Sequence, residues 1–162
     1  MQTRILTLGA TLLALSILAG CNQSPAPRAP AAQPSTETFQ DFGDYELHYN
    51  ALRTDSLTPE VARSYGIQRS SNRVMLTVTI LHKQADQSPR KPIDGEVKVD
   101  AYNLNGQLKD IDMRRVSEGE AIYYLGEVSI SGAEILVFDI SATPTGESAP
   151  FKVKLKREFF AS

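Results

Sequence analysis

The chain holds few residues whose type and spacing could carry metal or catalytic chemistry. It has one cysteine, Cys21, and two histidines, His48 and His82, whereas a protein metal site draws three or four ligands from residues at workable spacing. Ser88-Pro89-Arg90-Lys91 matches Ser-x-x-Lys in its letters. That chemistry needs a helix to bring the lysine beneath the serine, and Pro89 favours a loop here. We therefore predict no metal, no cofactor and no enzymatic activity.

Cys21 can carry a different chemistry, because a signal sequence precedes it. Residues 1–4 are short and basic, residues 5–17 are almost wholly apolar, and small residues stand just before the cysteine. An apolar run of about 15 residues is too short to span a bilayer as a helix, so it favours a signal peptide over residues 1–20. One alternative is cleavage by the general signal peptidase, which leaves Cys21 unmodified. Leu18-Ala19-Gly20-Cys21, however, resembles the lipobox of bacterial lipoproteins.

The lipobox resemblance implies that the precursor is cut before Cys21 and that acyl chains, palmitate among them, are attached there. Two or more chains hold a protein durably on a membrane, whereas a single chain does not. In that family an aspartate after the cysteine retains the protein in the inner membrane, and Asn22 stands at this position. We therefore expect a lipoprotein of the cell envelope, held in the inner leaflet of the outer membrane and facing the periplasm.

Composition separates a tether from a folded body. Residues 21–38 combine the lipidated cysteine with four prolines set among Ala, Gln, Ser and Thr, and such a segment reaches up to roughly 50 Å. Residues 39–162 have the length of one domain. The formal net charge of −2 gives no electrostatic footprint for nucleic acid, so we expect no nucleic-acid partner.

Apolar and polar residues alternate along most of the body, which is typical of half-buried strands. Asn105-Gly106 favours a tight turn, so residues 108–116 should return as the hairpin partner of residues 97–101. The pattern predicts seven strands, near residues 45–51, 74–80, 97–101, 108–116, 121–130, 135–141 and 151–155. We predict an all-β fold, a single antiparallel β-sandwich of immunoglobulin-like topology, with an open barrel as the alternative.

Residues 58–66 break the alternation and predict one short helix after the first strand. Thr58 can cap the free amides, Pro59 suits the first helical position, and Gly66 can take the left-handed conformation that ends a helix. About two turns of helix cannot stand alone in water. We therefore expect this helix to pack on the sandwich through Val61 and Tyr65.

Three lysines alternate with apolar residues in the last predicted strand, at Lys152, Lys154 and Lys156. Lysine side chains protect a sheet edge against pairing with another chain, so this strand is expected at an edge or facing water. An anion-binding stripe is the alternative interpretation of the same row.

Three stretches, Gly43–Ala51, Leu57–Ile67 and Glu118–Tyr124, together resemble the family known as domain of unknown function 4426, small exported proteins of Gram-negative bacteria. The resemblance covers nearly all of the body. It implies a compact domain located in the envelope, and it implies no catalytic residues, because the family has no assigned activity.

Polar residues at non-periodic positions on the first strand, after the helix and beside the later turn mark where these stretches could meet and form a binding surface. We select six candidates: His48, Tyr49, Arg69, Asn72, Glu118 and Tyr123. The first hypothesis is a non-enzymatic interaction module that binds another envelope protein or a cell-wall component. The alternatives are a periplasmic hydrolase that uses carboxylates or histidine in an unfamiliar arrangement, and a chaperone-like structural domain that lends a sheet edge to a client.

Overall fold

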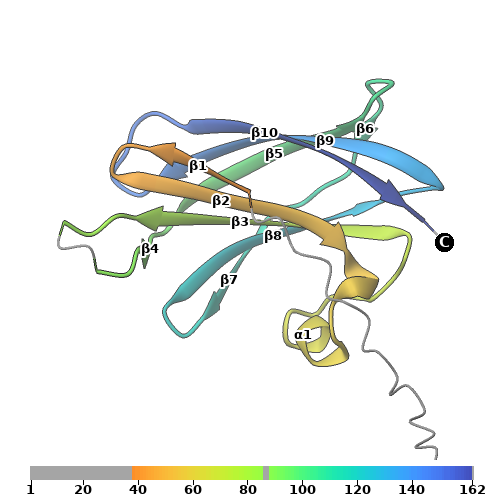
Figure 1. Ribbon diagram of the computed structural model, residues 1–162, viewed down its shortest axis with the longest axis horizontal. Coiled ribbons are helices and arrows are strands. Elements are labelled where there is room, and N and C mark those ends of the chain that lie inside the picture. The colour runs from red at the N-terminus through yellow and green to blue at the C-terminus, as the bar shows by residue number, and fades with distance from the viewer. Residues whose placement is uncertain (1–37, 86–87, 162) are drawn as a thin grey trace, which may run out of the picture. The chain divides into compact units, whose positions relative to one another are not determined.

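A computed structural model describes residues 38–85 and 88–161 of the chain (Figure 1). The expected signal peptide, the lipid-attachment residue Cys21 and all of the expected tether before Thr38 lie outside these residues. Within the described part of the chain, no helix is long and apolar enough to cross a membrane.

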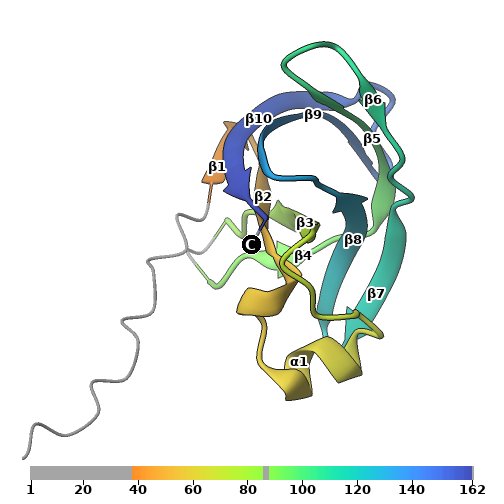
Figure 2. The same ribbon diagram turned by 90° about the vertical axis from the view of Figure 1, so that its right-hand side faces the viewer.

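The described residues form two antiparallel sheets that pack face to face (Figures 1 and 2). Sheet A has the order β1-β2-β3-β8-β7, with β4 beside β3, and sheet B has the order β10-β9-β5-β6. The strands of sheet A are β1 (Thr38–Phe42), β2 (Tyr45–Arg53), β3 (Arg73–His82), β4 (Lys91–Pro92), β7 (Arg114–Glu118) and β8 (Ala121–Ser129). Those of sheet B are β5 (Gly95–Asn103), β6 (Leu108–Lys109), β9 (Ala133–Pro144) and β10 (Phe151–Phe160).

The strand order confirms the predicted immunoglobulin-like sandwich. The order β2-β3-β8-β7 facing β10-β9-β5 is that of the two sheets of an immunoglobulin constant-type domain, and β6 extends the second sheet. β1 is an additional strand on the free edge of β2. The helix therefore follows the second strand of the structure, which is the first strand of the predicted set.

The core lies between the sheets and consists of the inward phase of each strand. Most of the alternate residues of β2, β3, β9 and β10 are buried there, and burying one large aliphatic side chain contributes about 1.5–3 kcal/mol. The largest fully buried side chains include Phe138, Leu47, Leu76, Ile80, Leu136 and Ile140.

Tyr124 ties the two sheets together where the chain passes from β4 into β5. Its hydroxyl lies 2.6 Å from Asp94 Oδ1 and accepts the Gly95 N–H at 2.8 Å. Arg115 of β7 donates from Nε to the same Asp94 oxygen at 3.0 Å. Burial, followed by the hydrogen bond to Asp94, raises the pKa of Tyr124 to about 12.

The predicted hairpin over residues 108–116 is wrong in its second half. Only Leu108 and Lys109 pair with β5, and Arg114–Glu118 joins the other sheet as β7 beside β8. The connecting residues cross close to Gly126, where an added Cβ would lie 2.5 Å from the Met113 sulfur. The glycine on β8 admits this crossing, and an alternation pattern does not reveal it.

The predicted helix is present as α1 (Pro59–Ser64), which follows the 3-10 turn η1 (Thr54–Ser56). Thr58 Oγ1 accepts the Val61 N–H at 3.3 Å, and Gly66 has a φ of 64°. The expected contact through Val61 is wrong, because this side chain is 38% exposed and Ala62 is buried at 3%. Because the side chain of Ala62 is small, α1 can lie close to the sheet there. The helix covers part of the outer face of sheet A (Figure 2).

Candidate functional site

A line of side chains crosses the outer face of sheet A from strand to strand. Phe39 on β1 is the Cα partner of His48 on β2, and His48 is the partner of Thr79 on β3. Directly opposed residues of antiparallel strands point to the same side of a sheet. His48 alternates with Leu47 and Tyr49, which are buried in the core, so the line lies on the outer face.

The same line continues onto β8. Val78 of β3 is paired with Tyr124 of β8, and both point into the core. Thr79 and Tyr123 stand one position further along each strand and therefore share the outer face. Thr79 and Tyr123 are half-buried. We define the sheet A row as Phe39, His48, Thr79 and Tyr123.

His48 is held in a fixed orientation by a buried carboxylate. Glu46 is 3% exposed, and its Oε2 lies 2.9 Å from His48 Nε2 and 2.5 Å from Arg90 Nε. The hydrogen bond with His48 and then that with Arg90 hold the pKa of the Glu46 carboxyl below its usual range, despite its burial. An ionised carboxylate only accepts hydrogen bonds, so Nε2 carries a proton and donates to it.

Phe39 completes this end of the sheet A row. Its ring stacks on the His48 imidazole with centroids 5.3 Å apart and an interplanar angle of 18°, while the side chain remains 56% exposed. The imidazole is therefore fixed on its edge by Glu46 and on one side by an aromatic ring. Stacked aromatic pairs contribute about 0.5–1.5 kcal/mol beyond the area that they bury.

Tyr65 fixes the other end of the sheet A row by joining α1 to the β7–β8 hairpin. Its hydroxyl donates to Glu118 Oε2 at 2.7 Å, and its ring meets that of Tyr123 edge-on at 6.4 Å. Arg114 donates a hydrogen bond to the Tyr65 carbonyl. The hydrogen bond to Glu118, together with partial burial, raises the pKa of Tyr65 to about 12.

The segment between β2 and β3 forms a closed excursion over the outer face of sheet A. Thr54, which is fully buried, donates from its hydroxyl toward the Gln68 and Ser70 carbonyls at 2.9 and 3.1 Å and accepts the Ser70 N–H at 2.9 Å. Arg69 donates to the Asp55 carbonyl at 2.8 Å. We call residues 54–70 the flap; its apolar side packs on a second hydrophobic cluster on sheet A.

The structure brings together only part of the predicted candidate site. His48 and Tyr123 lie on the sheet A row, and Glu118 reaches it through Tyr65. Tyr49 is 6% exposed and belongs to the core, because adjacent residues of a strand point to opposite faces.

Arg69 and Asn72 close the connection into β3 instead of joining the row. Arg69 lies within the flap and donates to the Asp55 carbonyl. The Asn72 carbonyl accepts the Ile130 N–H at 2.9 Å. Both residues are exposed. Sequence reasoning missed Glu46, although its position two residues before His48 on one strand places both on one face. It also missed Arg90, which comes from outside the alternating pattern and carries no periodic signal.

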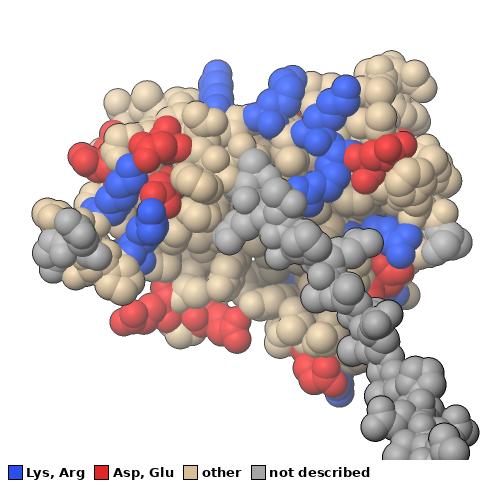
Figure 3. Space-filling view, in the orientation of Figure 1, with Lys and Arg blue, Asp and Glu red and all other residues tan. Residues whose placement is uncertain are grey.

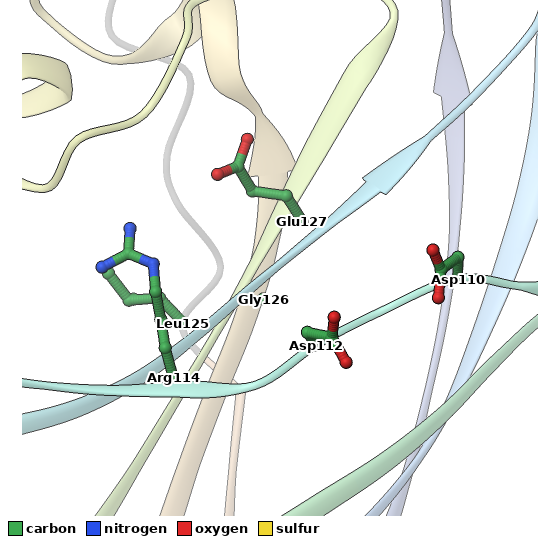
Figure 4. A pocket seen from close by; sticks show the side chains of 6 residues that line it. All are labelled: Asp110, Asp112, Arg114, Leu125, Gly126 and Glu127. Atoms are coloured by element: carbon green, nitrogen blue, oxygen red, sulfur yellow. The ribbon is translucent and has the colours of Figure 1, made fainter.

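Two hollows lie away from the sheet A row. A cavity of about 220 Å³ lies between β8 and the segment that leads into β7, and it is lined by charged side chains that include Asp110, Arg114 and Glu127 (Figure 4). An open depression of about 470 Å³ lies between the β5–β6 hairpin and the start of β9. Across the described ranges, no group of three His, Cys, Asp or Glu side chains is placed to hold a metal ion.

Comparisons with solved structures agree with this fold. A DUF4426 family protein, PA0388 from Pseudomonas aeruginosa PAO1, is 34% identical, with a TM-score of 0.66 over 78% of this chain and 96% of that chain. A copper-bound variant of FetP from uropathogenic Escherichia coli strain F11 is 12% identical, with a TM-score of 0.53 over 78% of this chain and 96% of that chain. At that identity the likeness to FetP concerns the fold alone.

No curated protein matches the sequence. The family model described as "Domain of unknown function (DUF4426)" matches residues 39–162, which includes every residue of the sheet A row and all of the sandwich after Thr38. With this match and the likeness to PA0388, the chain belongs to the DUF4426 family.

Proposed function

We propose that the protein is a lipid-anchored lipoprotein of the bacterial envelope whose sandwich is a non-enzymatic binding module. The sheet A row is its recognition surface, and the partner is another envelope protein or a cell-wall component. One observation carries the proposal: a buried carboxylate holds a half-buried imidazole against an exposed aromatic ring on the outer face of sheet A.

Rigidity is what makes this row suited to binding. A side chain that is already held in its bound orientation loses little conformational entropy when a partner arrives. Glu46 fixes His48, and Tyr65 packs against Tyr123. Neighbouring strands lie about 4.8 Å apart, so the row from β1 to β8 crosses three spacings and spans roughly 14 Å. Such a line can contact several units of an extended chain, either a peptide or a glycan.

Membrane attachment in this proposal rests on Cys21 and the apolar segment that precedes it. Two or more acyl chains at this residue hold the domain at the inner leaflet of the outer membrane, facing the periplasm. FetP, which shares the fold, was recombinantly expressed in the periplasm of E. coli BL21(DE3). We do not infer copper binding by this chain from the copper bound to FetP, because the two proteins share the fold alone.

Site-specific photo-crosslinking in intact cells tests the recognition surface. Benzoylphenylalanine in place of Tyr123 should capture a defined partner, whereas the same probe in place of Tyr102, a half-buried tyrosine on sheet B, should not. His48→Ala should reduce capture at position 123, because it removes the centre of the row. Capture that is equal at the two positions, or unchanged by His48→Ala, would refute the proposal.

Metabolic labelling tests the anchor separately. The wild-type protein should incorporate labelled palmitate, and the Cys21→Ser variant should not. If the wild-type chain incorporates no labelled palmitate, the anchor is refuted. The crosslinking result on the sheet A row does not depend on this outcome.

A further inference from the structure

The outer face of sheet B carries protruding apolar side chains at one end. Leu104 is 57% exposed, Leu108 is 76% exposed and Phe160 is 58% exposed. Leu108 is the Cα partner of Tyr102, and Phe160 is the partner of Ala133. Leu108 and Phe160 therefore project from the outer face of the sheet, and Leu104 lies in the hairpin that joins β5 to β6.

Lysines line the same face along the edge strand β10. Lys152, Lys154 and Lys156 are all exposed, and Lys154 Nζ lies 2.7 Å from both Asp139 Oδ1 and the Tyr102 hydroxyl. Figure 3 shows lysine and arginine side chains along the course of β10. Acidic side chains share this face at Glu96, Asp100, Asp139 and Glu158, but β10 itself carries only Glu158 among its lysines.

The chain enters the sandwich on the side where β10 lies. β1, the first described strand, runs beside β10 in both views (Figures 1 and 2), and the rings of Phe42 and Phe151 stack at 4.5 Å between these two strands. Residues 22–37 separate Cys21 from β1. A chain of this length and composition reaches at most roughly 50 Å, so acyl chains on Cys21 would keep the sandwich within that distance of the lipid.

We propose that the outer face of sheet B rests on the lipid bilayer that holds the anchor, with Leu104, Leu108 and Phe160 inserted among the lipids. This inference rests on the lipid anchor of the proposed function. Lys152 and Lys156 contact anionic headgroups at the bilayer surface. The sheet A row, on the opposite side of the sandwich, then faces the periplasm.

The shape of this apolar group favours lipid over a protein partner. Three separate side chains that each expose more than half of their surface fit a fluid medium, whereas a protein interface packs to the density of a core. A tether adds to the affinity of the face itself, because it converts binding into an intramolecular event at an effective concentration of the order of millimolar.

Fluorescence quenching on the lipidated chain tests the contact directly. Cys21 is the only cysteine and is blocked once acylated, so a cysteine introduced elsewhere takes a dye selectively. With brominated phospholipids in the vesicles, dye at Leu108→Cys should be quenched strongly. Dye at the control Val61→Cys, an exposed apolar position on α1 over sheet A, should not be. Equal quenching at both positions, or none at Leu108→Cys, overturns the inference.

Vesicle binding by the unlipidated chain separates this inference from the anchor. The described residues from Thr38 onward belong to one compact unit, so residues 21–162 with Cys21→Ser keep the whole sandwich. This protein should sediment with vesicles of phosphatidylethanolamine and phosphatidylglycerol. Leu108→Ser should lower the affinity for these vesicles about tenfold, since a buried leucine contributes about that factor, and Val61→Ser should not change it.

Failure of the two proposals gives different results. Palmitate labelling without any vesicle binding by the Cys21→Ser chain keeps the anchor and overturns the contact of sheet B. Vesicle binding without palmitate labelling overturns the anchor and keeps the contact. A protein crosslinked to Leu108 in cells, together with an unquenched dye there, shows that a protein covers this face and also overturns the inference.

Discussion

The two outer faces of the sandwich differ in how their side chains are held. On sheet A, Glu46 holds His48 and the flap packs against Tyr123, so the polar and aromatic groups are fixed by partners. On sheet B, Leu104, Leu108 and Phe160 protrude with more than half of their surface exposed. Fixed groups suit a partner of defined shape, and protruding groups suit a fluid surface. The difference indicates that the faces serve different contacts.

The largest effect is expected where the flap is fixed to sheet A. Thr54→Val removes a hydroxyl that joins the first residue of the flap to Gln68 and Ser70 at its other end, and it leaves the half-buried Ser70 N–H without this acceptor. The free energy of unfolding should fall by about 2 kcal/mol, measured by urea denaturation. Thr79→Val, on the sheet A row, is the matched control and should change it by less than about 0.5 kcal/mol. Equal losses in the two variants would show that the flap is not held in this way.

Next in size is the loss of the orientation of His48. Glu46→Gln removes the charged acceptor of Nε2, so partner capture at position 123 should fall about tenfold, because a hydrogen bond to a charged group is worth roughly that factor. Vesicle binding through sheet B should stay unchanged. A parallel loss of both activities would mean that the two faces are not independent.

The same carboxylate should make stability depend on pH. The pKa of Glu46 is lowered in the folded protein from its usual 4.5, so its contribution is present above about pH 4.5 and is lost as the pH falls through the lower folded value. Unfolding measured from neutral to acidic pH should show this loss in the wild type and a smaller one in Glu46→Gln. Identical pH profiles would contradict the assigned ion pair.

A smaller effect is expected at the contact between α1 and β7–β8. The pKa of Tyr65 is raised to about 12 in the folded protein, so the stability from its bond to Glu118 is complete below about pH 10 and is lost as the pH rises toward 12. Tyr65→Phe should remove one of the phenols that titrate near pH 12 in the absorbance at 295 nm. The phenol of Tyr124, which ties the two sheets, should remain in that range. A titration curve unchanged by Tyr65→Phe would exclude the bond.

The smallest effect on stability is expected on β10. Lys152→Ala together with Lys156→Ala should change the free energy of unfolding by less than about 0.5 kcal/mol, because both side chains are exposed. The same double variant should lower binding to phosphatidylglycerol vesicles several-fold, while Lys98→Ala, at a lysine paired with Glu96 on the same face, should not. If vesicle binding survives the double variant, the lysines do not contact lipid and only protect the edge of the sheet against pairing with another chain.

Local patterns predicted most of the fold because each element follows from neighbouring residues. Alternation located the strands, and Thr58, Pro59 and Gly66 set the limits of α1. Residues 108–116 could not be predicted in the same way, since their change of sheet depends on Gly126 of another strand. The contact of Ala62 with the sheet likewise depends on how closely α1 approaches it.

The candidate site was predictable only where it follows strand phase. His48 and Tyr123 both occupy outward positions, so their place on one face follows from alternation. The same alternation places Tyr49 inside, which corrects its selection as a surface residue. Arg90 lies outside the strands that the alternation pattern identified, so only the folded chain shows that it meets Glu46.

Hydroxyl-radical footprinting of the lipidated protein tests the separation of the two faces most directly. Oxidation of Leu108, Phe160, Phe39 and Tyr123 would be compared by mass spectrometry in detergent, in pure lipid vesicles and in isolated envelopes. The account predicts that lipid alone protects Leu108 and Phe160, and that Phe39 and Tyr123 gain protection only in envelopes. Protection of Tyr123 by pure lipid, or of Leu108 only in envelopes, would contradict it.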